Sequence, residues 1–364
     1  MNGEERSPGS ALPPGNGSPP KQAHGLWPWL NGRALRIVLG TLLSLLFLWL
    51  ALRKAPLDQV LATFALVRYR YVALALALVL LSAPLRALRW KLLYHPAQEG
   101  LPVLPLAAIL LIGQMLNIVL PARGGEIARI YFMNSTAGRR PAHTLGTIVV
   151  EKWLDILMLL VLLLLTPLFV TLPSWFQDSR TALAVFAVAF FSTALGVSYG
   201  QERLLRLAAP GARFLPPRWR RPAREALETG LRSLDVLRSP RVGLQLQAWS
   251  LLIWMLNVLV NYVVFLALGL SLPLAAAVFV LAVLQVGVAV PSAPGRLGVF
   301  HYLCVLALSV FGVEGTMALS YGIALYFVVF LPPTALGGLC LWWYTVRPGA
   351  RHDLSFLFHR YTGL

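Results

Sequence analysis

Apolar residues fill long uninterrupted runs of this chain rather than the short periodic segments of a soluble domain. About 20 apolar residues suffice for a helix to cross the hydrocarbon core of a bilayer. Seven runs approach or reach that length: Ile37–Leu52, Tyr71–Leu85, Leu104–Leu120, Thr147–Leu172, Ala182–Tyr199, Ala248–Leu270 and Leu274–Val290. Two further runs are less regular, the short Val299–Val313 and the long Thr316–Tyr344, which is interrupted by Pro332-Pro333. We therefore predict an all-α, polytopic transmembrane helical bundle of seven to nine spans.

The composition narrows the class of protein further. Of the 364 residues, 58% are hydrophobic and 12% are charged, yet the net charge is +17. A soluble nucleic-acid-binding protein could have that net charge, but its surface would need far more charged residues. We therefore exclude nucleic acid as a partner and an ordinary soluble enzyme as the class. Cys304 and Cys340 both lie in apolar runs, which predicts two buried thiols rather than a disulfide or a zinc site.

Charge and composition divide the chain into a domain and two tails. Residues 1–33 are mostly Pro, Gly, Ser and Asn at their start and are predicted to form a disordered tail. The transmembrane domain is expected at 34–345, followed by a tail at 346–364. The basic segment 201–245 holds ten arginines and four acidic residues before residue 242, so we place it and the C-terminal tail in the cytoplasm. This orientation predicts a multi-pass protein of a bacterial inner membrane, with the side of the N-terminus left open.

Inside the basic segment, four leucines fall on one helical face: Leu227, Leu231, Leu234 and Leu237. Charged residues occupy the opposite face, so we predict an amphipathic helix. It either lies along the inner leaflet, with its arginines at anionic headgroups, or packs on the bundle as a cytoplasmic helix.

Two places interrupt the membrane pattern in a similar way, at 118–129 and 288–299. Each has a long apolar run, then Pro, small residues, Gly and Arg, and then a new apolar run. Proline ends the first helix and suits the first turn of the next, and glycine permits a tight turn. The N-terminus of the second helix offers free N–H groups to an anion, and a neighbouring arginine suits phosphate. Two broken helices in corresponding halves indicate a transporter site and an internal pseudo-repeat; ordinary loops at span ends are the alternative.

A second cluster of charged residues begins the apolar run at Thr147. Glu151 and Asp155 share a helix face, with Lys152 beside them. Ionisable residues inside a span usually face the bundle interior and have a partner. We expect the partners to be Lys152 and the arginines of the first interruption. The cluster belongs either to the substrate pathway or to a salt bridge at the membrane edge.

The candidate substrate-binding residues follow from these two clusters. They are Arg123, Gly124, Gly125, Glu126, Arg129, Glu151, Lys152, Asp155, Ser292, Gly295, Arg296 and His301. His301 could titrate near neutral pH or be structural. Gln114 and Asn117 share a face before the first interruption, which predicts hydrogen bonding between helices. The sequence has no phosphate-binding P-loop and no recognised catalytic or metal-binding motif, so we predict no catalytic residue, metal or cofactor.

Three motifs resemble the lysylphosphatidylglycerol synthase transmembrane-region family of flippase-like membrane proteins. They are Leu120–Glu126 with Arg129, Val149–Asp155, and Pro291–Phe300. The similarity covers residues 35–345. In two-domain members of the family this region moves the aminoacylated lipid that a separate soluble domain makes. Only 20 residues follow the last predicted span, so the resemblance implies a stand-alone member without the synthase activity. Such relatives have been linked to lipid-linked sugars, hopanoids or other isoprenoid lipids.

The sequence departs from the family pattern at three positions. Arg296 stands where the family commonly has a second glycine, His301 where it has glutamate, and Lys152 where it has arginine. The second interruption is therefore more cationic than in the family. This change argues against a cation- or proton-coupled role for a carboxylate there and favours an anionic lipid.

The residues and the resemblance together predict translocation of an anionic lipid or lipid-linked intermediate across the inner membrane. No nucleotide-binding element is present, so the driving force would be a gradient or the substrate itself. One alternative is an integral-membrane transferase acting on a polyprenyl-phosphate lipid; the other is a non-transporting scaffold that uses the basic loop. Membrane lipids are the expected partners, with a second copy of the chain and lipid-biosynthesis enzymes as candidate protein partners.

Overall fold

The computed structural model describes residues 57–120, 124–166, 180–200, 217–287 and 294–346, with residue 203 and a few positions between 42 and 50. Every regular element in these ranges is a helix, so the all-α prediction is confirmed for the described residues. Arg123 and Ser292 lie outside them, as do the N-terminal tail, most of 201–216 and residues 347–364.

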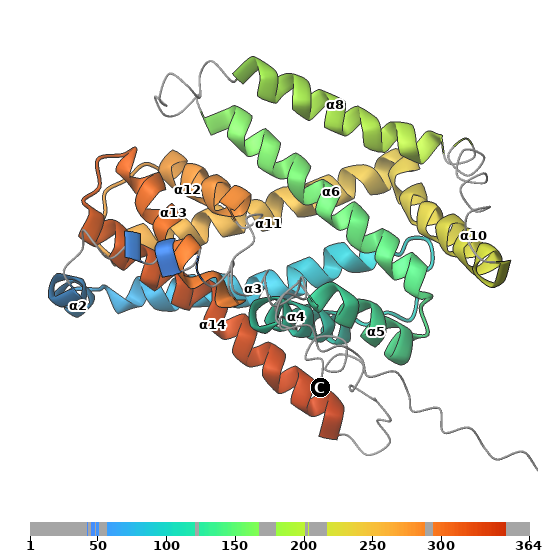
Figure 1. Cartoon of the computed structure of the whole chain (residues 1–364), viewed down its shortest axis with the longest axis horizontal. Helices are drawn as coiled ribbons and strands as arrows, with labels where there is room; N and C mark the ends of the chain where they lie inside the picture. The colour runs from blue at the N-terminus through green and yellow to red at the C-terminus, as the bar shows by residue number, and fades with distance from the viewer. Residues whose placement is uncertain are drawn as a thin grey trace, which may run out of the picture.

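The helices differ in length, and the differences define the architecture (Figure 1). In chain order they are α2 (Leu57–Ala65), α3 (Tyr69–Leu92), α4 (Val103–Val119), α5 (Gly125–Ala137), α6 (Pro141–Leu165), α8 (Arg180–Tyr199), α10 (Pro217–Arg232), the 3-10 helix η4 (Ser233–Arg238), α11 (Pro240–Ala267), α12 (Leu274–Gly287), the 3-10 helix η5 (Pro294–Arg296), α13 (Leu297–Ser309) and α14 (Gly315–Val346). Three of them, α3, α11 and α14, are long and apolar enough to cross a membrane. The 25-residue α6 and the 20-residue α8 also have the length to cross.

Helix α14 continues through Pro332 and Pro333, although the sequence pattern predicted an interruption there. Proline inside a membrane helix is tolerated because neighbouring helices and local side chains satisfy the carbonyl groups that it leaves free. Just after the two prolines, the Thr334 hydroxyl donates to the Phe330 carbonyl at 2.6 Å, as it does in a continuous helix. The last apolar run is therefore one 32-residue helix.

Helices α4 and α5 form a hairpin whose two ends lie on the same side of the molecule. At its tip, the backbone N–H of Gly125 donates to Asn117 Oδ1 at 2.9 Å. At its open end, Arg139 donates to the carbonyl of Glu99 at 3.0 Å, just before α4 begins. At 1.5 Å per residue, α4 measures about 25 Å and α5 about 20 Å, so each arm falls short of a full crossing. The run Leu104–Leu120 therefore forms one arm of a re-entrant hairpin.

Helices α12 and α13 form a second hairpin of the same kind. Near its tip, Gly287 packs so closely on Leu303 that a Cβ atom would overlap the leucine side chain. Near its open end, the rings of Phe279 and Phe311 lie 5.7 Å apart. The short run Val299–Val313 thus forms the returning arm.

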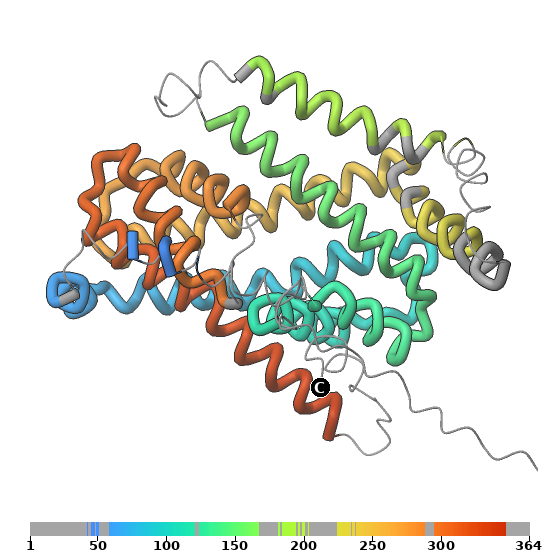
Figure 2. The backbone as a smooth tube through the Cα atoms, viewed as in Figure 1, coloured from blue at the N-terminus to red at the C-terminus, as the bar shows by residue number. Residues whose placement is uncertain are grey.

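The two halves repeat the same order of elements in opposite directions. A long helix, two hairpin arms and a second long helix make up α3–α6 and again α11–α14. Helices α3 and α11 are antiparallel, because the Arg68 N–H donates to the Ala267 carbonyl at 2.9 Å while Arg89 donates to Ser250 Oγ at 3.2 Å. The hairpins therefore enter from opposite ends of the molecule, α12 and α13 on the left and α4 and α5 on the right in Figure 2. This inverted arrangement agrees with the predicted pseudo-repeat.

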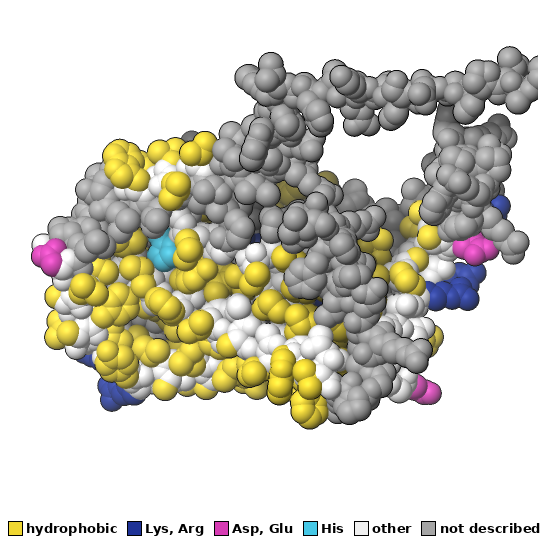
Figure 3. All heavy atoms as spheres, turned by 60° about the horizontal axis from the view of Figure 1, so that its bottom comes forward, with side chains coloured by type: hydrophobic (Ala, Val, Ile, Leu, Met, Phe, Trp, Pro, Cys, Tyr) yellow, Lys and Arg dark blue, Asp and Glu magenta, His cyan; other side chains and the backbone are white. Residues whose placement is uncertain are grey.

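Apolar and charged side chains separate along the molecule as a bilayer requires. On the face in Figure 3, hydrophobic side chains cover most of the described surface, and charged side chains gather mainly near its two ends. Large apolar side chains are exposed along the long helices, among them Leu74, Leu251 and Phe327. Burial of such side chains is unnecessary where lipid tails replace water.

The basic amphipathic helix packs on the bundle. Helix α10 contacts α6, and a Cβ on Gly146 of α6 would overlap the Ser233 hydroxyl that follows α10. This contact supports the packed alternative over a helix lying free along the leaflet. The C-terminal end of α14 lies at the same end of the molecule, where Tyr344 meets Phe132 of α5 at 5.6 Å. The basic segment and the end of α14 are thus on one side, in agreement with the charge pattern.

Two neighbouring glycines of α14 provide a test of this packing. A Cβ on Gly337 would overlap the Leu111 carbonyl of α4 and lie 2.7 Å from Met115 Cβ, whereas a Cβ on Gly338 meets nothing within 4 Å. Gly337→Ala is therefore expected to lower the free energy of unfolding by about 1–3 kcal/mol. Gly338→Ala is expected to leave it unchanged or raise it by up to about 1 kcal/mol. Denaturant titration of both variants in detergent checks this, and equal midpoints would contradict the α4–α14 contact.

Candidate functional site

The first interruption is built by close backbone approach between α4 and α5. Glycine at position 125 is required because a Cβ there would overlap the Gly113 carbonyl oxygen. The same approach brings the Asn117 amide oxygen to the Gly125 N–H, which confirms interhelical hydrogen bonding by Asn117. One of the free N–H groups expected at the start of α5 is thus already bonded within the protein.

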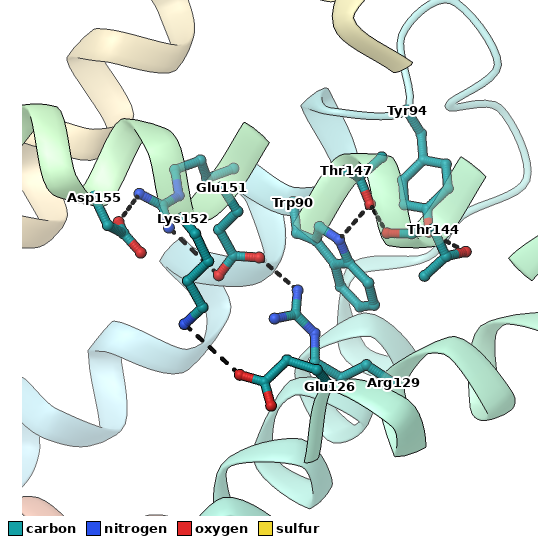
Figure 4. Close-up of polar contacts among 10 residues, drawn as sticks. Trp90, Tyr94, Glu126, Arg129, Thr144, Thr147, Glu151, Lys152 and Asp155 are labelled. Carbon is teal, nitrogen blue, oxygen red and sulfur yellow. Dashed lines mark hydrogen bonds and ion pairs between the residues drawn. The ribbon is translucent and has the colours of Figure 1, made fainter. Parts of the chain in front are cut away.

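A buried network of four charged side chains joins α3, α5 and α6. Arg89 donates to Asp155 at 2.7 Å and lies 3.5 Å from Glu151. Arg129 donates to the other oxygen of Glu151 at 2.5 Å (Figure 4). The side chains of Arg89, Arg129 and Glu151 are 1%, 7% and 9% exposed. Two arginines thus balance two carboxylates, which is the condition for burying such charges.

Aromatic and hydroxyl side chains hold this network in place. The guanidinium of Arg129 lies over the Trp90 ring, 4.3 Å from its centre. The Trp90 indole donates to Thr147 at 3.2 Å, and the Thr147 hydroxyl donates to the Thr144 carbonyl at 2.8 Å. Figure 4 shows Tyr94 beside them, donating to the Thr144 hydroxyl at 2.9 Å. The ring face and the ion pair together fix the direction of Arg129.

A second, looser charge pair lies on the outer side of the network. Lys152 Nζ and Glu126 Oε1 are 4.0 Å apart, with side chains 55% and 23% exposed. Lys152 is the twelfth residue of α6, about 17 Å from its start. Its neighbours on the exposed face of α6 are apolar: Leu145, Val149 and Ile156. A half-exposed lysine therefore stands about halfway along this 25-residue helix, within an exposed apolar stripe.

The second interruption ends in a turn of left-handed backbone. Gly295 has φ 78° and Arg296 has φ 57°, a conformation that an arginine rarely adopts. Tyr326 of α14 donates to the Gly295 carbonyl at 2.8 Å and thereby fixes the turn. His301 is buried, its ring nitrogen contacts the Leu297 carbonyl, and its ring lies 5.4 Å from that of Tyr326. The 3-10 helix η5 also contacts α4, so the second turn packs against the first hairpin.

The structure sorts the predicted site residues into two groups. Glu126, Arg129, Glu151, Lys152 and Asp155 form one cluster, with Gly124 and Gly125 at the hairpin tip beside it. The predicted pairing of Glu151 with an arginine of the first interruption is confirmed by Arg129.

Gly295, Arg296 and His301 form the second group, on the second hairpin. His301 contacts its own helix backbone, which supports the structural interpretation of this residue.

Sequence reasoning missed Arg89, the most buried charged residue of the network. The apolar run Tyr71–Leu85 stops before Arg89 and so placed this residue in a loop, whereas α3 continues to Leu92. The signal was present in the sequence, because Ala87 and Trp90 extend the buried face of that helix. Ser250 of α11, which accepts from Arg89, carried no such signal.

Metal binding has no support in the described helices. No group of three or more His, Cys, Asp or Glu residues that could hold a metal ion occurs in that part of the chain. Both cysteines are free thiols; Cys304 is buried, as predicted, whereas Cys340 is only half-buried.

Comparison with known proteins places the whole bundle in one family. Residues 37–337 match the family model described as the lysylphosphatidylglycerol synthase TM region. A UPF0104 membrane protein of Methanothermobacter thermautotrophicus is 26% identical over 284 residues, covering 73% of this chain and 83% of that protein. The UPF0104 membrane protein PH1989 of Pyrococcus horikoshii is 22% identical over 330 residues, covering 84% of this chain and 95% of that protein. No solved structure matches the chain. The protein is therefore a multi-pass helical membrane protein that belongs to the lysylphosphatidylglycerol synthase transmembrane-region family.

Proposed function

We propose that this protein moves an anionic lipid, or an anionic lipid-linked intermediate, across a bacterial inner membrane without altering it chemically. The observation that carries the proposal is Lys152, half-exposed about halfway along α6 and paired only loosely with Glu126. A cation at that depth among lipid tails is unfavourable by about 2.5–3.5 kcal/mol unless it meets water or an anion. A lipid phosphate passing along α6 supplies that anion.

The inverted hairpins support the same function. Re-entrant hairpins that enter from opposite sides bring two interruptions of the membrane pattern toward the middle of the bundle, an arrangement typical of transporters. Movement of one half against the other would expose the cluster alternately to each side. The basic segment and the end of α14 would face the cytoplasm.

The carboxylates of the site are poorly suited to the transferase alternative. Glu151 and Asp155 are both bonded to arginines, so neither carboxylate is free to take a proton from a substrate. The scaffold alternative rests on the basic segment. Because α10 packs on α6, neutralising exposed Arg224 and Arg238 tests that alternative better than deleting the segment.

The test is lipid translocation in proteoliposomes that contain a fluorescent phosphatidylglycerol. The unmodified protein is expected to move the lipid faster than protein-free vesicles do. Lys152→Gln is expected to slow lipid translocation about tenfold, because it removes the positive charge that would face the phosphate. Lys152→Arg keeps that charge and is expected to retain translocation. Arg241→Gln removes an exposed cation at the start of α11 and is expected to transport normally. Equal rates with and without protein, for glycerol- and isoprenoid-based phosphates alike, would reject translocation.

A further inference from the structure

Arg86 is a charged residue of α3 that the buried network leaves unbalanced. It lies one turn before Arg89 and is half-buried in the helix. Its guanidinium has neither a hydrogen bond nor an ion pair with any residue that the structure describes. Its four neighbouring charges are Asp155, Arg89, Glu151 and Arg129, of which Asp155 acts most strongly. Arg86 therefore stands beside the ionic cluster without belonging to it.

The charges around Arg86 are already matched among themselves. Arg89 and Arg129 balance Glu151 and Asp155. Arg86 adds one positive charge that no described carboxylate neutralises. The Nε–H of Arg129 is also buried without a hydrogen-bond acceptor, so the cluster still has a donor available for an anion. Unsatisfied groups of this kind inside a protein indicate a missing water, ion or ligand.

We propose that Arg86 binds the phosphate group of the lipid and thereby selects a phosphate-bearing headgroup. This inference rests on the proposed function and names the chemistry of its substrate. A guanidinium keeps its charge at any accessible pH and offers a fork of N–H donors that matches two phosphate oxygens. Arg89 cannot take this role, because Asp155, Glu151 and Ser250 already occupy it.

The phosphate that Arg86 binds can belong to a lipid or to a soluble ester, and the lipid agrees with the proposed function. Arg86 lies on the same side of α3 as the buried Ala75 and Val79, away from the exposed Leu74 and Leu81. A phosphate group therefore has to reach Arg86 from the bundle side of α3. Inorganic phosphate is included in the experiment below to separate the two sources.

Lipid retention by the purified full-length chain tests this role without requiring transport. The chain is reconstituted in nanodiscs of phosphatidylcholine with a minor fraction of phosphatidylglycerol, and bound lipid is measured by native mass spectrometry. Arg86→Met is expected to retain about tenfold less phosphatidylglycerol than the unmodified chain. Arg86→Lys is expected to retain an intermediate amount, because the charge remains and the fork is lost. Arg70→Met, near the other end of the same helix, is the matched control and is expected to retain as much as the unmodified chain.

The outcomes separate the inference from the proposed function. Equal lipid retention by Arg86→Met and Arg70→Met, in protein that elutes as one folded species, would overturn the role of Arg86. Displacement of the lipid by inorganic phosphate at matched concentration would assign the site to a soluble anion and reject the lipid. If the unmodified chain retains the lipid through Arg86 but does not transport it, the proposed function fails while the binding role stands.

Discussion

Glu151→Gln is expected to lower the free energy of unfolding by about 3–5 kcal/mol and to abolish lipid movement. The carboxylate of Glu151 serves two buried arginines, Arg129 at 2.5 Å and Arg89 at 3.5 Å. An amide of the same size leaves both guanidinium groups without their shared charge in a region closed to water. Denaturant titration in detergent and translocation in proteoliposomes measure the two effects.

A matched control and a double variant identify the cause. Glu228→Gln removes an exposed carboxylate paired with Arg224 on α10 and is expected to change stability by less than about 0.5 kcal/mol. Replacing Glu151 and Arg129 together by methionine removes both charges of one pair and is expected to recover much of the stability. In that double variant, Arg89 still forms its ion pair with Asp155. A Glu151→Gln protein as stable as the unmodified chain would contradict the buried network.

Gly125→Ala is expected to prevent the first hairpin from closing, at a cost of about 3 kcal/mol. Its Cβ would overlap the Gly113 carbonyl oxygen and lie 2.7 Å from the Asn117 side chain that bonds to the Gly125 N–H. The overlapping atom, the Gly113 carbonyl oxygen, belongs to the backbone of α4 and cannot move aside as a side chain can. Because α5 holds Glu126 and Arg129, their geometry would be lost with the hairpin.

The control variants introduce the same alanine side chain at glycines that have more free space around them than Gly125 has. Gly243→Ala lies in a helix where a Cβ would meet nothing within 4 Å, and it is expected to be neutral or slightly stabilising. A Cβ at Gly113 would lie 2.8 Å from the Arg129 side chain and 3.1 Å from the Gly125 carbonyl oxygen, a lesser overlap than at Gly125, so Gly113→Ala is expected to cost less than Gly125→Ala. Thermal unfolding of the three variants orders them, and a Gly125→Ala protein with an unchanged melting temperature would contradict the tight hairpin.

Much of the site was predictable because its residues are charged although they lie within or beside apolar runs, where charged residues are rare. Arg129, Glu151 and Asp155 are charged positions within or beside apolar runs, and such positions are unfavourable unless paired. The partner of Asp155 was not predictable in this way, because Arg89 is distant in sequence and was assigned to a loop. Its helix ends later than the apolar run does, and the end of an apolar run does not mark the end of a helix.

The sequence by itself determined the membrane class, the all-α architecture and the two interruptions. Long apolar runs and the positions of arginine determine these features locally, without reference to the rest of the chain. The tertiary structure decided which apolar runs form single long helices and which form hairpins, because this depends on the close approach of Gly125 to the Gly113 carbonyl and of Gly287 to the Leu303 side chain. Among the described residues of the buried cluster, it also decided which charges pair and that Arg86 beside them has no ion pair. Pairing depends on distances between helices, and helix packing alone determines those distances.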